Sequence, residues 1–587
     1  MIDEPTTNAD PLRLGSRRQI GDGIVLPGAL HCERGQSQRQ HARRLFLAAV
    51  VVFSPASLDA LAGASIYYVS GTGDDGLSGT DPSSAWRTIT RVNQQVLQPG
   101  DKVFFEGGSL FPGTLVLAGS ESGTSLAPIT FASYGVGSGE VWAKNDTGFD
   151  MYNVSGIRIT NLIVTGSGRN TNNGIGISFY ADLPGDVKLP WIRIDHCRVR
   201  GFRRGGISIG SWAGRTGFEN IRVTQNQLDQ NGNNGMAVWG QYGTDWGQTL
   251  QDYPHRSIYI ARNVFESNWG DPLRRTRSTG SGCEVSQAAR VLIEYNEAFD
   301  NGRLNSFSGG GPIGIWMWDV LQGVIQYNES HHNSSGTLDG GGFDLDGGCV
   351  DSWMQYNYSH DNDGTGFLIA QFPNGARPMR DVTVRYNVSE RDGGRGSAAA
   401  LQLWNGDSAG PPIREAVFHN NTVFVETKPL GITRGFRVFG GGGFVSSGFA
   451  NNIFHSRGSS AWVGESVSAG IWLGNLYFAE AAPFVIRQGG VAYSSLDAWR
   501  TATGHELFGG PTGFQADPQL NAPGDGGTIG DPMALETLLA YQLQPASPFK
   551  DAGFPLQAYG IPLGPTDYFG IPLVQGPNVS IGAHEGL

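Results

Sequence analysis

An asparagine that recurs about every thirty residues constrains the fold of this chain more than any other feature. Successive members stand 29–37 residues apart, and an apolar side chain comes three positions before most of them. A unit this short cannot bury its own apolar face, so such repeats must stack on one another. Asparagine at a fixed bend indicates a ladder of side-chain amides that bond from coil to coil and tolerate a left-handed backbone. The series is Asn226, Asn263, Asn296, Asn328, Asn357, Asn387, Asn421 and Asn452.

A second polar series follows five residues later and supports the same architecture. With 88 Gly among 587 residues but no Gly-X-Y period, and with 39% hydrophobic residues, the chain is neither collagen nor disordered. Each repeat has room for two or three short strands between Gly-rich turns. We therefore predict an all-β fold, a parallel β-helix with coils of about 30 residues; propeller blades of four strands need about 40 residues and fit less well. The second series is Asn231, Asn268, Asn301, Asn333, Asn362 and Asp392.

Both ends of this repeat region carry segments typical of one group of proteins. Residues 67–70 (YYVS) and 86–89 (WRTI) near the start, and 543–548 (LQPASP) and 581–585 (IGAHE) near the end, carry the likeness. They resemble the opening and closing coils of secreted bacterial right-handed parallel β-helix proteins, the carbohydrate-active pectate-lyase-like superfamily. The resemblance covers about residues 65–587 and implies a right-handed coil with closing coils from about residue 480. It does not select one activity.

The first 64 residues are typical of a leader with an export signal. The pair Arg43-Arg44 precedes an apolar run at 46–53, and small-residue cleavage signals follow at 60–64. The paired Arg resembles a twin-arginine signal, and an ordinary secretory peptide is an equal alternative. The run is too short to span a bilayer, so we expect a secreted or periplasmic protein without a membrane partner after processing. The net charge of −12 makes nucleic acid an improbable partner, and we expect a monomer.

One strand of each coil alternates strictly between apolar and other side chains. This is the second strand, counted from the ladder Asn, and neighbours on a strand face opposite sides. The residues expected to point inward are Met236/Val238, Cys283/Val285, Ile315/Met317, Phe343/Leu345, Phe367/Ile369 and Leu401/Leu403. The residues expected to point outward are Ala237/Trp239, Glu284/Ser286, Trp316/Trp318, Asp344/Asp346, Leu368/Ala370 and Gln402/Trp404.

The outward set combines indoles with carboxylates, which is typical of a glycan-binding cleft. An outward Trp presents an apolar face to a sugar ring and an N–H to a hydroxyl. We expect Trp239, Trp316, Trp318 and Trp404 to stack on sugars. The alternative is that a loop or the C-terminal tail covers them.

The carboxylates suggest glycoside hydrolysis, which needs one acid and one base or nucleophile. Asp344 and Asp346 are expected to form this pair, with Glu284 assisting or replacing one of them. Two residues along a strand separate the first pair by about 6.6 Å, and two coils separate Glu284 from Asp344 by roughly 9.6 Å. Carboxyl separations of about 6.5–9.5 Å belong to inverting enzymes, so inversion is favoured.

Three further polar residues complete the predicted site. Gln402 lies on the same outward face, and His331 and His360 are expected to stand side by side at its margin. We expect all three to orient sugar hydroxyls. A histidine at a polar turn is otherwise a structural hydrogen-bonding group.

Other activities fit parts of the same pattern. The segment at 343–348 (FDLDGG) could also hold Ca²⁺ or cap a turn; no cofactor is required by the hydrolase interpretation, and Ca²⁺ is kept as an alternative. A polysaccharide lyase or uronate epimerase would need a base, for which Arg377, Arg380, Arg395 and the two histidines are candidates. Non-catalytic glycan binding is the third possibility. A polygalacturonase-like activity is disfavoured because the Gly-His-Gly and Arg-Ile-Lys segments of those enzymes are missing from this sequence.

Overall fold

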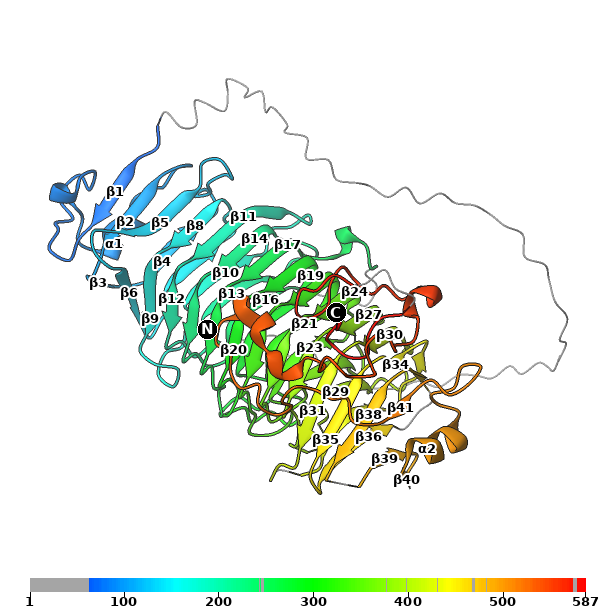
Figure 1. Cartoon of the computed structure of the whole chain (residues 1–587). Coiled ribbons are helices and arrows are strands. Elements are labelled where there is room, and N and C mark those ends of the chain that lie inside the picture. The colour runs from blue at the N-terminus through cyan, green and yellow to red at the C-terminus, as the bar shows by residue number, and fades with distance from the viewer. Residues whose placement is uncertain are drawn as a thin grey trace, which may run out of the picture. The chain divides into compact units, whose positions relative to one another are not determined.

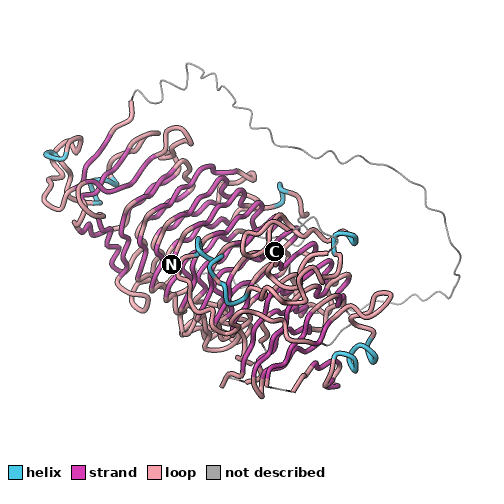
Figure 2. Tube along the Cα trace, viewed as in Figure 1, coloured by secondary structure: helices cyan, strands magenta, loops and turns pink. Residues whose placement is uncertain are grey.

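The strands wind into a coil whose turns stack on one another (Figure 1). This computed structural model describes residues 63–586 apart from 242, 244–246, 376, 397, 430, 467–469, 482 and 574–577. The predicted leader at 1–64 lies outside the described residues except for its last two positions. Strands and loops dominate the described chain, and its helices are short (Figure 2). The helices are η3 (Pro82–Ser84), α1 (Ile89–Asn93), η4 (Leu250–Asp252), α2 (Leu496–Thr503), η5 (Pro532–Thr537), η6 (Leu539–Tyr541) and η7 (Leu556–Tyr559).

Each central coil contributes its first strand to a 14-stranded sheet and its second and third strands to a 27-stranded sheet. Among the described strand pairs, only β39 with β40 is antiparallel. In two coils the second and third strands run together as β19 (Ser281–Glu294) and β21 (Ile313–Gln326). This arrangement confirms the predicted right-handed parallel β-helix.

The remaining strands fall into three stacks. The 14-stranded sheet contains β3 (Leu110–Pro112), β6 (Gly139–Lys144), β9 (Leu162–Gly166), β12 (Arg198–Arg200), β15 (Gln227–Asp229), β18 (Val264–Glu266), β20 (Glu297–Phe299), β22 (Glu329–His331), β25 (Tyr358–His360), β28 (Val388–Glu390), β31 (Thr422–Glu426), β35 (Ile453–Arg457), β38 (Leu476–Glu480) and β41 (Phe514–Gln515). The second strands are β4 (Leu115–Ala118), β7 (Phe149–Tyr152), β10 (Ile177–Ala181), β13 (Ile207–Ser211), β16 (Asn234–Trp239), β23 (Gly341–Asp346), β26 (Phe367–Gln371), β29 (Leu401–Asn405), β32 (Thr433–Phe439), β36 (Ala461–Ser466), β39 (Ile486–Gln488) and the returning β40 (Val491–Tyr493). The third strands are β1 (Ile66–Val69), β2 (Lys102–Glu106), β5 (Ile129–Tyr134), β8 (Ile157–Thr160), β11 (Lys188–Asp195), β14 (Gly217–Thr224), β17 (His255–Ala261), β24 (Val350–Gln355), β27 (Arg380–Arg385), β30 (Ile413–His419), β33 (Phe444–Val445), β34 (Gly448–Ala450) and β37 (Ile471–Leu473).

The core runs inside the coil, and the second strands supply one wall of it. Met236, Cys283, Ile315, Phe343 and Phe367 stack one per coil, and each is fully buried. The predicted alternation and its register are therefore confirmed along this wall. Because one residue of slip would turn every side chain to the other face, this packing fixes which residues point outward.

The asparagine ladders hold successive coils together as predicted. In the first ladder, Asn328 donates its backbone N–H and its Nδ2 to Oδ1 of Asn357, at 3.0 Å each. The same pair of bonds repeats along the series and continues to Asn475, one coil beyond the predicted members. The second ladder follows the same rule and ends on Asp392. Each rung satisfies buried amide groups that would otherwise be left unpaired.

The ladder Asn was expected to adopt the left-handed backbone conformation of the bend, but another residue adopts it. It is the residue before the ladder Asn, for example Tyr327 at φ 53° and Tyr356 at φ 59°. The Asn itself is occupied by bonds to both neighbouring coils, so the turn of the backbone falls on its predecessor. Tyr327 and Tyr356 stack with ring centroids 5.0 Å apart and extend the ladder on the outside of the coil.

The C-terminal segment leaves the coil and packs against the 14-stranded sheet. Leu535, Leu538 and Tyr541 of this tail form a buried cluster with Tyr358 and Val388 on that sheet. In Figure 1 the tail appears as the orange and red trace lying over the green strands. The described residues contain no helix long and apolar enough to cross a membrane.

Candidate active site

The outward side chains of the second strands from β16 to β29 form one face, which we call the acidic face. The strands pair in parallel, so side chains from successive coils line up in two columns about 4.8 Å apart along the stack. The first column is Ala237, Glu284, Trp316, Asp344, Leu368 and Gln402. The second is Trp239, Ser286, Trp318, Asp346, Ala370 and Trp404. The predicted carboxylates and indoles are thus brought together on one face.

Asp344 is the most deeply placed carboxyl of this face. Its side chain lies on a residue that is 3% exposed, and its Oδ1 has no hydrogen-bond partner among the described residues. Burial raises the pKa of Asp344 well above its ordinary value, and the charges of Asp346 and Asp339 raise it further. A buried carboxyl without a compensating cation takes up a proton instead of remaining ionised.

Asp346 is half-buried and therefore more accessible to a ligand. Burial is the largest influence and raises the pKa of Asp346 to about 7, with the charges of Asp339 and Glu284 acting in the same direction. The backbone N–H of Gly347 donates to its Oδ1 at 2.7 Å and opposes this shift. A carboxyl with a pKa near neutrality can exchange a proton during a reaction at physiological pH.

Glu284 lies two coils before Asp344 and is held by an indole. The Trp318 Nε1–H donates to its Oε1 at 3.1 Å. Burial raises the pKa of Glu284, while this hydrogen bond and the charge of Arg277 lower it in part. Glu284 and Asp346 therefore meet Trp318 from opposite sides, one by a hydrogen bond and one as its neighbour in the column.

A fourth carboxylate, Asp339, was missed by sequence reasoning. It lies in the loop before β23 with φ 58°, and accepts the Gly311 N–H at 2.7 Å. Its charge raises the pKa of both Asp344 and Asp346. The period-two pattern could not reveal it, because a loop residue has no alternation; only its position beside three glycines marks it.

The four predicted indoles are half-buried, so part of each remains accessible. The neighbouring coil anchors the N–H groups of two of them: Trp239 donates to Ser208 Oγ at 2.9 Å, and Trp316 donates to Ser281 Oγ at 3.1 Å. Trp239 lies over Gly210, where a Cβ would come within 2.2 Å of the ring. Glycine at that position is what lets the indole lie flat along the face.

The aromatic column continues towards the N-terminus. Tyr180 lies 6.0 Å from Trp239 between ring centroids, and Tyr152 lies 6.3 Å from Tyr180. At the other end, Trp404 lies 6.2 Å from Phe439. Aromatic surface therefore accompanies the acidic residues on both sides. The buried Gln402 belongs to the same face, and its Oε1 lacks a partner among the described residues.

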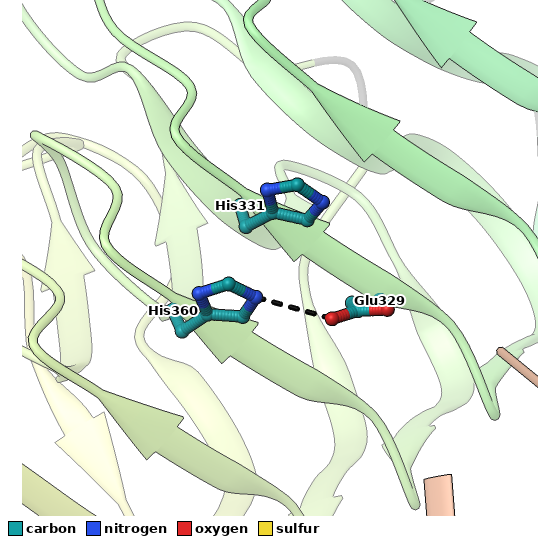
Figure 3. Close-up of side chains that lie close together, drawn as sticks. All are labelled: Glu329, His331 and His360. Atoms are coloured by element: carbon teal, nitrogen blue, oxygen red, sulfur yellow. Dashed lines mark hydrogen bonds and ion pairs between the residues drawn. The ribbon is translucent and has the colours of Figure 1, made fainter. Parts of the chain in front are cut away.

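His331 and His360 do not lie at the margin of this face, which corrects the expectation. They end β22 and β25 of the 14-stranded sheet, whose outward side is covered by the C-terminal tail. They do lie side by side, with rings 4.7 Å apart and nearly parallel at 8° (Figure 3). The short strand and the polar turn resemble a cleft border in sequence, and only the docking of the tail decides otherwise.

The histidines belong to a buried polar network. His360 Nε2 and Glu329 Oε1 are 3.1 Å apart, and the Ile529 and Gly530 N–H groups of the tail each donate to Glu329 at 2.7 Å. Burial lowers the pKa of His360, but its bonds to Asp361 and Glu329 outweigh this effect and raise it to about 9. For Glu329 the balance is the opposite. Burial raises its pKa, but the hydrogen bonds from His360 and the Ile529 N–H outweigh this effect and lower the pKa below its ordinary value.

Two groups of side chains among the described residues are close enough to hold a metal ion, and both contain His360. One joins Glu329, His331 and His360; the other joins His332, His360 and Asp361. Parallel rings 4.7 Å apart cannot both aim a nitrogen lone pair at one ion about 2.1 Å away without rotating. Glu329 is also fully engaged by the tail. The first group is therefore better explained as a structural network.

The arginines considered as bases are engaged away from the acidic face. Arg377 is buried and paired with Asp319 at 2.5 Å, and Arg395 pairs with Asp363 at 2.8 Å. Arg380 begins β27, a third strand. None of the three is placed beside Asp344.

Comparisons with known proteins point to glycan-active relatives. The chain is 24% identical over 484 residues to a lacto-N-biosidase of Bifidobacterium longum subsp. longum, covering 66% of this chain. It spans 28% of the length of that protein. No family model matches the chain.

Solved structures with a similar chain course include two enzymes. A GH136 lacto-N-biosidase from Eubacterium ramulus is 20% identical, with a TM-score of 0.48 over 65% of this chain and 68% of that one. Pectate lyase Pel9A is 15% identical, with a TM-score of 0.39 over 90% of this chain and 98% of that one. The predicted resemblance to carbohydrate-active β-helix proteins is confirmed by the sequence match.

Proposed function

We propose that this protein is a glycoside hydrolase that cleaves an oligosaccharide or polysaccharide bound across the acidic face. One observation carries the proposal: carboxyls with raised pKa values share a face with half-buried indoles. The similarity to a lacto-N-biosidase supports the same class of reaction.

The proton donor in this proposal is Asp346. It is half-buried, and its pKa of about 7 leaves a large protonated fraction at neutral pH. Glu284 is the base, since it is also half-buried and is oriented by the Trp318 indole. The sequence prediction paired Asp344 with Asp346 and kept Glu284 as a replacement; we choose the replacement because Asp344 is 3% exposed and favours its neutral form.

Two coils and one column separate the Cα atoms of Glu284 and Asp346 by about 11–12 Å, so the two side chains must extend toward each other to bring their carboxyl groups to the roughly 6.5–9.5 Å that admits a water molecule. The reaction is then a single displacement: Asp346 gives its proton to the leaving oxygen, and Glu284 takes a proton from the attacking water. The anomeric carbon inverts. Asp344 and Asp339 act as positioning residues that keep the Asp346 pKa high or hold a buried proton.

The indoles and Gln402 bind the glycan in this proposal. Trp239 lies two coils before Trp316 and Trp318, and Trp404 lies three coils after them, so at about 4.8 Å per coil these ring faces contact sugars roughly 10 and 14 Å apart along the glycan. Gln402 offers its unpartnered Oε1 to a hydroxyl. We further propose that the protein is a monomer, and that the predicted leader directs it to the periplasm or out of the cell.

The test is a saccharide screen that distinguishes product classes. The purified chain is incubated with neutral and acidic polysaccharides and with a lacto-N-bioside, with and without EDTA. New reducing ends without ultraviolet absorbance, and an inverted anomer in early NMR spectra, are the expected result. An unsaturated product would replace the hydrolase by a lyase; binding without any product would leave a glycan-binding protein. Loss of turnover in EDTA would assign Ca²⁺ a role.

A further inference from the structure

A cavity of about 330 Å³ lies at the corner where first strands turn into second strands. The residues that line it include Arg203, Arg204 and Arg274 together with Asn173 and Asn233, whose side chains carry guanidinium and amide groups. Every one of these groups can donate hydrogen bonds. In a chain with a net charge of −12, three arginines around one cavity are a local reversal of charge.

One carboxylate partly balances the cavity. Asp271 lines it and pairs with Arg203, with Nε and Oδ2 2.8 Å apart. The lining therefore contains three arginines and one carboxylate, and Arg203 and Asp271 compensate each other. Arg204 is exposed, and no ion pair within the described part of the chain holds it. Guanidinium groups bind planar oxyanions through paired hydrogen bonds, so carboxylate and sulfate are the ligand groups that match this wall.

Further arginines surround the same loop. The guanidinium carbon of Arg303 lies 3.5 Å from the centroid of the Trp269 ring, and that of Arg169 lies 4.7 Å from it. Trp269 stands two residues before Asp271 in the loop that lines the cavity. The stacked pair fixes the start of this loop and adds positive potential beside the cavity.

The cavity-lining residues precede second strands of the coil, including two that carry the acidic face. Arg203 and Arg204 come just before β13, Asn233 just before β16, and Arg274 comes seven residues before β19, the strand that carries Glu284. The loop from 270 to 280 that lines the cavity also bears Arg277, whose charge lowers the pKa of Glu284. At about 4.8 Å per coil, the cavity lies roughly 10–20 Å from the Asp344 coil, which is two to four sugar units.

We propose that this cavity binds an acidic sugar unit, bearing a carboxylate or a sulfate, of the glycan that the acidic face cleaves. The position of that unit along the glycan rests on the proposed function, whereas the binding itself does not. The cavity then selects anionic glycans, and Arg203 and Arg204 place the negative group four coils from Asp346 and two coils from Glu284.

Binding is tested in the full-length parent protein, because monosaccharide probes have no glycosidic bond that the protein could cleave. The probes are D-glucuronate, D-glucose 6-sulfate and neutral D-glucose, titrated by NMR at 50 mM and 300 mM NaCl. We expect at least one charged probe to bind about tenfold more tightly than glucose, and to weaken at the higher salt. The probe that binds distinguishes carboxylate from sulfate.

Arginine variants decide whether the cavity is responsible. Arg204→Gln with Arg274→Gln removes two charges and should abolish the preference, and Arg204→Gln alone should reduce it severalfold. Arg222→Gln on β14 is the matched control, because it removes the same charge from an exposed arginine on a third strand; it should bind as the parent does. Circular dichroism confirms that each variant is folded.

Three outcomes would overturn the proposal: glucose binding as tightly as both charged probes, unchanged binding in the double variant, or an equal loss in Arg222→Gln. These outcomes are separable from failure of the proposed function. A chain that binds the charged probes through Arg204 but hydrolyses nothing retains the cavity and loses the reaction. A chain that hydrolyses neutral glycans and ignores the charged probes does the reverse.

Discussion

Two outward faces of the same coils carry buried carboxyl groups, and the surroundings of these groups shift their pKa values in opposite directions. On the 14-stranded sheet, Glu329 accepts two N–H bonds from the tail and contacts His360, and its pKa is lowered. On the acidic face, one carboxyl oxygen of Asp344 has no hydrogen-bond partner in the described part of the chain, and the pKa of Asp344 is raised. A buried carboxylate with hydrogen-bond donors and a cationic partner stabilises the fold. A buried carboxyl without them holds a proton at neutral pH, which is typical of groups that transfer protons in active sites.

The largest expected effect is on the acidic face. Asp346→Asn removes the proposed proton donor, so kcat/KM on the substrate found in the screen should fall by about 10³-fold, or about 4 kcal/mol of transition-state free energy. Thermal stability should not fall, because the raised pKa of Asp346 shows that its charge is disfavoured in the fold. Asp351→Asn on β24 makes the same charge change and should leave turnover unchanged. Full activity in Asp346→Asn would remove it from the mechanism.

The opposite result is expected on the covered face. Glu329→Gln removes the charge that faces His360 and should lower the free energy of unfolding by about 3 kcal/mol, measured by denaturant titration. Activity per folded molecule should be unchanged, because Glu329 lies on the other sheet. Glu266→Gln on β18 is a control at a half-buried site and should cost less than about 1 kcal/mol. A Glu329→Gln protein that is stable but inactive would reverse the roles of the two faces.

The covered face should also show a defined pH dependence. The pKa of His360 is raised to about 9 in the fold, so its contribution is fully present below pH 6.5 and is lost as the pH rises through about 9. The shift corresponds to about 3 kcal/mol, since one pKa unit is about 1.4 kcal/mol. Unfolding measured between pH 6 and 10 should show this loss in the parent and a flatter curve in His360→Gln. Identical curves in the two proteins would contradict a charged His360.

The contrast between the faces also explains which features the sequence could predict. Alternation with period two placed Asp344 and Asp346 outward, because the inward Phe343 and Leu345 admit only one register. The amide ladder was readable because every coil must satisfy the same buried amides. Both signals are local and recur in every coil, so a single sequence contains many examples of each.

Features that depend on a single long-range contact could not be predicted from the sequence. His331 and His360 were misplaced because their environment is made by Ile529 and Gly530, about two hundred residues away. Asp339 was missed because a loop residue has no periodicity. The preference of Glu284 over Asp344 as base depends on a difference in burial between two residues of the same column.

The smallest predicted effect tests whether the charge of Asp339 raises the pKa of Asp346 on the acidic face. Asp339→Asn removes a charge that raises the pKa of Asp346, while the amide can still accept the Gly311 N–H and tolerates the left-handed backbone. The Asp346 pKa should then fall below 7. Because the donor must be protonated, the alkaline limb of the pH–rate profile should move to lower pH, by about one unit.

The acid side of that profile distinguishes tuning from damage. Where Asp346 is protonated in both proteins, kcat should be the same, and Asp351→Asn should leave both limbs in place. A uniform loss of activity at every pH would mean that Asp339 only supports the loop. A limb that stays in place or moves to higher pH would show that its charge does not reach Asp346, and the comparison between the two faces would then rest on burial alone.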